Sequence, residues 1–346
     1  MKKEKEKCIV FCRYMLLAVV VGVLAGALDA VFGRGLLWIT DFRTAHVRTL
    51  LPFLPLAGLL ITWLYHHFDE ESLKGMILIF ETGQRKRESL PLLLIPLVLF
   101  GTWITHLFGG SAGREGVAVQ MGAALSHEIG RKLHVSSKDR VMLIVGMAAG
   151  FGGLFQTPLA AVFFALEVIV AGCVAYEALL PAMVASYMAA FTSHALGLEK
   201  FSVPLHETLA LSTPGQIGQV ILLGAAFGLT GLVFSGLLQK TKAWMAKVLP
   251  NPYRRIGLVS VALAAILFLG LGGRYCGLGT NLIQAAFAGD KVYSFDWILK
   301  LLLTVLTLSI GFQGGEVTPL FSIGATLGVL LGSILGLPVE LCAALG

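Results

Sequence analysis

The sequence predicts an all-α protein that crosses a membrane several times. Two observations on composition support this: 56% of the 346 residues are hydrophobic and 13% are charged, and the mean hydropathy is +0.83. A soluble globular domain carries about a quarter charged residues. The third observation is the count of 41 glycines. Glycines inside apolar segments indicate re-entrant and discontinuous helices, whose irregular backbone must be buried in protein.

Apolar stretches that are long enough to span a bilayer, or nearly so, follow one another along the chain. They lie at residues 14–31, 51–65, 92–107, 141–174, 178–195, 217–238, 256–271, 298–312 and 317–335. Several are too short to cross a hydrocarbon core of about 30 Å as one straight helix. Basic residues lie between the stretches, so we interpret the net charge of +6 as a positive-inside signal, with a cytoplasmic N-terminus, and expect no binding to nucleic acid.

The first candidate functional segment is Gly-Gly-Ser-Ala-Gly-Arg-Glu-Gly at residues 109–116, which places the ionisable residue Glu115 between apolar segments. An ionisable group inside a bilayer is costly, so it usually faces an ion or proton path. The glycines before it predict a broken helix. A similar run at residues 311–320 contains Glu316. Two carboxylates at the starts of two half-helices indicate ion handling.

These runs belong to an internal repeat with an offset near 200 residues. Residues 75–79 match 277–283, and residues 92–107 match 298–310. We therefore predict a first transmembrane repeat at 1–200 and a second at 201–346, in inverted topology. Because 346 minus 201 is 145, the first repeat continues without a partner, and we expect the second to be incomplete at its C-terminal end. The alternative is a loose alignment of two glycine-rich segments.

Three motifs resemble a known family. They are Gly-Arg-Glu-Gly at 113–116, Phe-Gln-Thr-Pro-Leu-Ala at 155–160, and Gly-Gly-Glu-Val-Thr-Pro at 314–319. In this order they are similar to the CLC family of anion channels and proton-coupled anion antiporters. The resemblance implies that Glu115 is a gating residue that blocks the anion path when ionised and carries a proton when it moves out. The late tyrosine of that family, and part of its subunit interface, have no counterpart here.

Two departures resemble the fluoride/proton antiporter branch, CLC-F. Met76 stands where chloride-type members have an anion-coordinating serine, and Val317 follows Glu316 where they have phenylalanine. Glu167 is followed by Val168, and the second glutamate of chloride exchangers is absent. The resemblance implies fluoride, or chloride, and protons as the transported ions, without cofactor or metal. It also implies a multi-pass protein of the cell inner membrane that forms a homodimer once the missing interface helices are supplied.

Half-helices that begin near Gly75, Glu115 and Val317 can direct their N-termini at an anion, because each N-terminus offers unpaired N–H groups and about half a positive charge. The residues expected to bind the anion are Gly75, Met76, Gly113, Arg114, Gly116, Val317 and Thr318. The simpler alternative is that the glycines only permit close helix packing.

For four residues the sequence leaves two possible roles open. Glu115 either carries protons or forms an ion pair with Arg114. Glu316 has two possible roles: it binds a proton or hydrogen fluoride, or it is an N-cap residue that accepts hydrogen bonds from the helix amides. Thr318 either donates its hydroxyl to a small anion or simply precedes Pro319. For Glu167 an interhelical hydrogen bond is favoured over a place in a proton path.

Three other functions remain open. A CLC-type chloride channel or chloride/proton exchanger is the closest alternative, although Met76 and Glu316 argue against it. An intramembrane enzyme needs a nucleophile or a metal set, and the chain has no His-Glu-x-x-His motif; we therefore expect no enzymatic activity. The third alternative is an inactive, truncated transporter.

Overall fold

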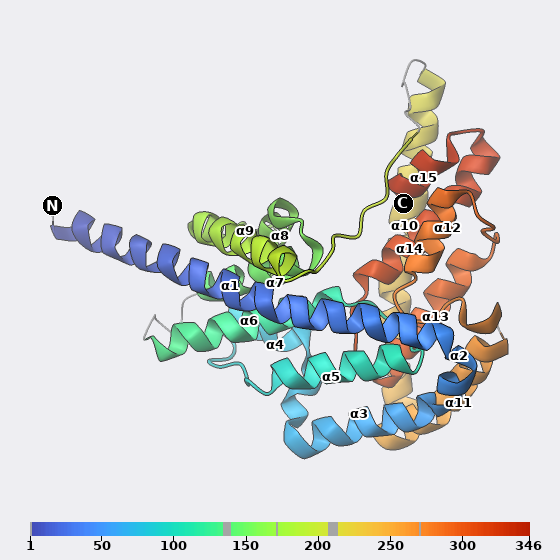
Figure 1. Ribbon diagram of the computed structural model, residues 1–346, viewed down its shortest axis with the longest axis horizontal. Coiled ribbons are helices and arrows are strands. Elements are labelled where there is room, and N and C mark those ends of the chain that lie inside the picture. The colour runs from blue at the N-terminus through green and yellow to red at the C-terminus, as the bar shows by residue number, and fades with distance from the viewer. Residues whose placement is uncertain (1, 134–139, 171, 207–213, 270) are drawn as a thin grey trace. The chain divides into compact units, whose positions relative to one another are not determined.

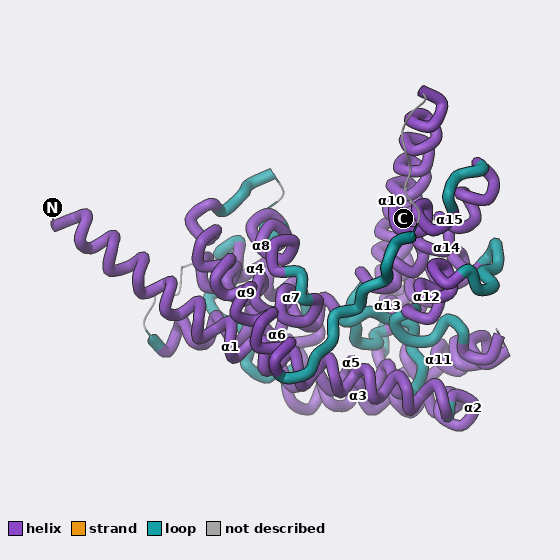
Figure 2. The backbone as a smooth tube through the Cα atoms, turned by 45° about the horizontal axis from the view of Figure 1, so that its top comes forward, coloured by secondary structure: helices purple, strands orange, loops and turns teal. Residues whose placement is uncertain are grey.

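The computed structural model describes residues 2–133, 140–170, 172–206, 214–269 and 271–346. These residues form helices and connecting loops (Figure 2), and within them the only β-type pairing is one isolated antiparallel bridge between Gly113 and Gly315. The predicted all-α class is therefore confirmed.

The helices vary widely in length, as a chain with re-entrant segments requires. The α-helices are α1 (Lys2–Ala45), α2 (Val47–Leu50), α3 (Leu54–Phe68), α4 (Met76–Gly83), α5 (Leu94–Leu107), α6 (Glu115–Lys132), α7 (Arg140–Phe155), α8 (Pro158–Glu167), α9 (Leu179–Ala195), α10 (Pro214–Val248), α11 (Pro252–Leu269), α12 (Thr280–Ala288), α13 (Asp296–Ile310), α14 (Val317–Leu335) and α15 (Val339–Leu345). Short 3-10 turns are η1 (Leu51–Phe53), η2 (Glu70–Lys74), η3 (Tyr176–Ala178) and η4 (Leu271–Gly273).

The chain divides into two compact units that interleave in sequence. Unit 1 contains Met1–Trp38, Leu64–Phe100 and Glu115–Phe201, and unit 2 contains Ile39–Trp63, Gly101–Arg114 and Ser202–Gly346. Helices α1, α3 and α5 each contribute residues to both units. The boundary predicted between residues 200 and 201 separates two sequence repeats. The compact units are defined by contacts and do not test it, so it stays a prediction.

Unit 1 is built around α7, which packs against α6, α8 and α9. Its core is rich in alanine and small aliphatic residues, and every residue of α7 between Val141 and Leu154 except Phe151 is buried. Glycines bring the helices close: a Cβ at Gly122 of α6 would meet the backbone of Gly146 and Gly150 of α7. This close packing between small residues is typical of helices in a membrane.

Unit 2 places α13 between α10 and α14. Phe234 of α10 packs with Leu301 and Val305 of α13 in a buried cluster. Helices α12, α14 and α15 lie side by side in both views (Figures 1 and 2). A Cβ at Gly324 of α14 would meet the backbone of Gly346, which follows α15. Unit 2 thus uses backbone-to-backbone contact in the same way as unit 1.

The order of elements matches the predicted repeat. Helices α4, α5, α6 and α7 of the first half correspond in order to α12, α13, α14 and α15 of the second. Equivalent glycines make equivalent contacts, because Gly122 touches Gly146 and Gly324 touches Gly346, at offsets of 202 and 200 residues. Chance alignment of glycine-rich segments does not produce this agreement, so the contacts support the repeat.

Among the residues that the structure describes, five segments are long and apolar enough to cross a membrane: Val10–Ala45, Val47–Phe68, Pro214–Val248, Pro252–Leu269 and Val317–Leu335. Several stretches predicted to span, or nearly span, are shorter helices, such as α5. The stretch predicted at 141–174 is divided into α7 and α8.

Two sequence features explain that division. Gln156 adopts a positive φ of 53°, and Pro158 opens α8. Proline lacks an N–H and is favoured at the first position of a helix, so it starts a new helix and does not continue α7.

Candidate functional site

In unit 1, helix α4 begins at Met76, directly after Gly75. Gly75 has φ +55° and ψ −122°, a conformation that a residue with a Cβ rarely adopts. A Cβ there would also lie 3.4 Å from Oε1 of the Gln120 side chain on α6. The predicted helix start is confirmed. Met76 is half-buried at the first position of α4, and its thioether cannot donate a hydrogen bond to an anion.

Also in unit 1, helix α6 begins at Glu115, as predicted. The Glu115 side chain is 1% exposed and that of Arg114 is 5% exposed, although both are charged residues. Gly116 follows and is half-buried. A carboxylate in the first turn of a helix is stabilised by the positive end of the helix dipole, and an anion is stabilised by the same end. Glu115 and an anion therefore have the same preferred location.

In unit 2, the loop before α6 pairs with the loop before α14. The backbone N–H of Gly113 donates to the carbonyl of Gly315 at 2.6 Å, and the N–H of Gly315 donates to the carbonyl of Gly113 at 2.8 Å. These two glycines are 202 residues apart, close to the predicted offset of about 200 residues. A reciprocal pair of bonds between equivalent residues has local two-fold symmetry.

The third predicted helix start, that of α14 at Val317, is also confirmed. Glu316 occupies the N-cap position and is exposed, and its side chain makes no capping hydrogen bond. The N-cap acceptor role considered from the sequence is therefore wrong. Thr318 is 6% exposed, and its Oγ1 has no hydrogen-bond partner among the residues that the structure describes. Such a hydroxyl is free to donate to a bound ion.

A buried lysine that the sequence analysis missed organises the loop before Gly113. The Nζ atom of Lys300 on α13 donates to Ser111 Oγ at 2.9 Å and to the carbonyls of Gly277 and Tyr275 at 2.6 and 3.2 Å. Ser111 Oγ also contacts Thr304 Oγ1 at 2.9 Å. The ammonium group thereby joins the loop that leads to α6 with the loop that leads to α12. The sequence signal was a single lysine within an apolar helix.

Ser111 also bears on the enzyme alternative, because residues 109–113 do match the Gly-x-Ser-x-Gly pattern of serine hydrolases. Such a serine must be reachable by substrate. Here Ser111 and Lys300 both have 0% exposure. In the described structure the Ser111 hydroxyl is hydrogen-bonded to Lys300, which holds the loop before α6 against α13.

Glu167 is the last residue of α8 and is exposed. Within the described part of the chain its side chain makes no hydrogen bond, so the interhelical bond favoured from the sequence is not formed. Its place in a proton path stays a prediction. The described residues also include no group of three or more His, Cys, Asp or Glu side chains arranged to hold a metal ion.

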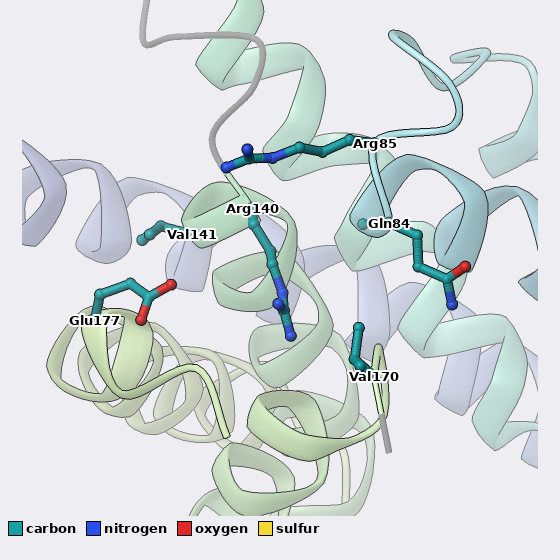
Figure 3. A pocket seen from close by; sticks show the side chains of 7 residues that line it. Gln84, Arg85, Arg140, Val141, Val170 and Glu177 are labelled. Atoms are coloured by element: carbon teal, nitrogen blue, oxygen red, sulfur yellow. The ribbon is translucent and has the colours of Figure 1, made fainter. Parts of the chain in front are cut away.

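Unit 1 contains one further feature, a cavity of about 340 Å³ between the end of α4, the start of α7 and the segment after α8 (Figure 3). Its lining residues are Gly83, Gln84, Arg85, Arg140, Val141, Val170 and Glu177. Figure 3 shows the Arg140 side chain extending between Gln84 and Glu177. None of the residues predicted to handle ions lines this cavity.

Comparisons with known proteins agree with the resemblance found in the sequence. A chloride/fluoride channel protein of Pseudomonas syringae pv. tomato is 37% identical over 344 residues, which cover 96% of this chain and 75% of that protein. An H(+)/Cl(-) exchange transporter, ClcA, of Yersinia pestis is 26% identical and covers 92% of this chain and 70% of its own length.

Solved structures are similar as well. The crystal structure of a CLC-type fluoride/proton antiporter matches with a TM-score of 0.94 and 49% identity, over 96% of this chain and 84% of that one. A slow cyanobacterial Cl-/H+ antiporter shares the fold, with a TM-score of 0.78 and 21% identity over 96% of this chain and 83% of that one. The sequence model of the voltage gated chloride channel family matches residues 57–346. This chain therefore belongs to the voltage gated chloride channel family, the CLC family named above.

Proposed function

We propose that this protein exports fluoride through the membrane in exchange for protons, and that Glu115 carries the proton. The observation that carries the proposal is the burial of Glu115, at 1% exposure, as the first residue of α6. An intramembrane carboxylate in this position is costly unless it serves ion transfer. The 49% identity to a CLC-type fluoride/proton antiporter supports fluoride as the substrate.

The coupling follows from competition for one location. The N-terminal amides of α6 stabilise either the Glu115 carboxylate or an incoming anion. When fluoride arrives, like-charge repulsion in a site with little water favours the protonated form of Glu115. Once the Glu115 carboxyl is neutral, the N-terminal amides of α6 can bind the anion instead. Each anion that enters thereby promotes uptake of a proton, which is the linkage that exchange needs.

Two residues favour fluoride over chloride in this scheme. Met76 offers no hydrogen-bond donor at the start of α4. Thr318, at the start of α14, has a buried hydroxyl without a partner among the described residues. Fluoride is small and strongly hydrated, so it gains more than chloride from a fixed donor that replaces water. Glu316 is exposed at the same helix start and is available to bind a proton or hydrogen fluoride.

We further propose a multi-pass protein of the inner membrane that works as a homodimer. The bacterial origin of the similar transporters supports the inner membrane, and the five apolar segments found among the described residues support several membrane crossings. Chloride/proton exchange is the second candidate, favoured by the similarity to the H(+)/Cl(-) exchange transporter. Membership in a family of channels and transporters argues against an intramembrane enzyme.

The test is ion release from liposomes that contain the full chain, recorded with a fluoride electrode and an external pH electrode. We expect fluoride release with coupled proton uptake, and at least tenfold less release from chloride-loaded vesicles. Equal chloride release would transfer support to the exchanger. Silence for both ions from correctly folded protein would support the inactive alternative.

The role of Glu115 is tested in the same vesicles with Glu115→Gln, which mimics the protonated side chain. We expect fluoride to move without protons. Glu199→Gln is the matched control, because Glu199 is an exposed acid of the same unit. Proton uptake at the wild-type ratio by Glu115→Gln would show that another group carries the proton.

A further inference from the structure

A second acidic residue of unit 1 is buried within a membrane-spanning segment. Asp29 lies in the apolar part of α1, Val10–Ala45, 19 residues after its start and 16 residues before its end. At a rise of about 1.5 Å per residue, this is near the middle of the segment. The side chain is 1% exposed. An ionisable residue within a membrane-spanning helix is rare and is usually functional.

Asp29 belongs to the face of α1 that packs against unit 1. On this face a Cβ at Gly22 or Gly26 would meet the backbone of α9, and a Cβ at Gly33 would meet Leu198 and Leu154. The spacings from Gly22 to Gly26, Asp29 and Gly33 are 4, 3 and 4 residues, so the four residues share one side of the helix. The carboxyl group therefore faces protein and not lipid.

The Asp29 carboxyl lies against Gly153 of α7, at the position where a side chain on that residue would be. Its Oδ2 has no hydrogen-bond partner among the described residues. Two hydroxyls of α9 contact the same turn of α7: Ser193 donates to the carbonyl of Gly153 at 2.6 Å, and Ser186 lies against Gly152.

Charged groups are not paired with this carboxyl in the described structure. The nearest cation along the helix, Arg34, donates to the carbonyl of Leu196 at 2.8 Å. The facing residues of α7 and α9 are Gly153 and Ala189, which are not ionisable. A buried carboxyl with an unsatisfied oxygen and no counter-charge is a group that can exist in a protonated form.

Small residues connect this carboxyl with Glu115 inside unit 1. Ala118 lies one turn after the start of α6, and its carbonyl touches Gly150 of α7. Gly153, which touches Asp29, lies one turn beyond Gly150. The route between the two carboxyls therefore follows three residues of α6, crosses to α7 and follows three residues of α7, with a rise of about 4.5 Å along each helix. No large side chain takes part in these contacts.

We propose that Asp29 is a second proton-carrying residue, which exchanges a proton with Glu115 through bridging water. The inference rests on the proposed proton-coupled function. In the step, the carboxyl of one residue loses a proton to water, and water delivers a proton to the carboxylate of the other. No other bond changes. Asp29 thereby supplies the path to the far side of the membrane that Glu115 needs after it releases its anion.

The experiment compares three proteins in liposomes, with fluoride and proton fluxes recorded together. Asp29→Asn keeps the shape of the side chain but cannot ionise, and we expect at least a tenfold loss of the proton flux per fluoride. Asp29→Glu restores a carboxyl, and we expect proton flux to return in part. Asp41→Asn is the matched control, because Asp41 is an exposed aspartate on the same helix, and we expect the wild-type ratio.

The outcomes separate the two proposals. If the wild-type chain moves fluoride without protons, the proposed function fails. If the wild type is coupled and Asp29→Asn keeps the same ratio, only the role of Asp29 is overturned. If Asp29→Asn does not fold, Asp29→Ser is measured in the same way. Failure of both variants to give folded protein would assign Asp29 a structural role and overturn the proposal.

Discussion

The contact between Gly122 and α7 predicts a large and position-specific effect of one methyl group. A Cβ at Gly122 would meet the carbonyl of Gly146 and would lie 2.9 and 3.0 Å from the N and Cα atoms of Gly150. All three atoms belong to the backbone of a neighbouring helix. They cannot rotate away as a side chain does, so Gly122→Ala must move α6 and α7 apart.

The magnitude follows from two opposing effects. Overpacking in a close-packed interior costs about 2–3 kcal/mol when the neighbours cannot yield. Replacing glycine by alanine within a helix stabilises the folded protein by up to about 1 kcal/mol, because alanine has the higher helix propensity. The expected net loss is about 1–2 kcal/mol, which corresponds to a lower melting temperature by roughly 2–6 °C for a chain of this class.

The matched control lies on the same helix and faces the same neighbour. A Cβ at Gly130 would be 3.2 Å from Cγ of Met142, which is a flexible side chain. Gly130→Ala should therefore equal the wild type or exceed it slightly. The assay is thermal unfolding of the purified proteins in detergent, monitored by size-exclusion chromatography after heating. Equal melting temperatures for the two alanine variants would refute the reasoning.

Two further predictions concern the residues near the helix starts. Lys300→Met removes three hydrogen bonds at once and leaves the carbonyls of Gly277 and Tyr275 without their donor. We expect the free energy of unfolding, measured by thermal unfolding, to fall by about 2–3 kcal/mol. Lys291→Met, at an exposed lysine, is the control and should leave it unchanged. Thr318→Val removes the buried hydroxyl at nearly constant volume; we expect fluoride affinity in calorimetry to fall about fivefold to tenfold, and an unchanged affinity would exclude the hydroxyl as a ligand.

The sequence predicted the helix starts better than the helix ends. Met76, Glu115 and Val317 open their helices as expected, because each follows a glycine-rich or capping segment whose chemistry is local. The extent of α1 was underestimated: it was predicted at 14–31 and covers Lys2–Ala45. Lysine and glutamate favour helix, so the polar residues at its start extend it beyond the apolar stretch.

The contacts that organise the site could not be predicted, because they join residues distant in sequence. Lys300 and Ser111 are 189 residues apart, and neither has a local pattern that identifies the other. Asp29 was a single acid in an apolar stretch, and only the position of Gly153 shows that it faces inward. Periodicity and motifs determine where helices begin, whereas pairing of buried polar groups depends on tertiary packing.

The two glutamates of the repeat illustrate how equivalent positions acquire different chemistry. Gly113 and Gly315 form reciprocal backbone hydrogen bonds. Glu115 lies two residues after Gly113, whereas Glu316 lies one residue after Gly315. That difference of one residue places Glu115 inside its helix at 1% exposure, while Glu316 stays in the N-cap position and is exposed. Desolvation raises the pKa of the Glu316 carboxyl, although part of its side chain is exposed. The Glu115 side chain is almost completely withdrawn from water, and a neighbouring anion then strongly favours its protonation. In the proposed mechanism, the near-complete burial of Glu115 is what makes it the stronger candidate of the two glutamates for coupling anion and proton movement.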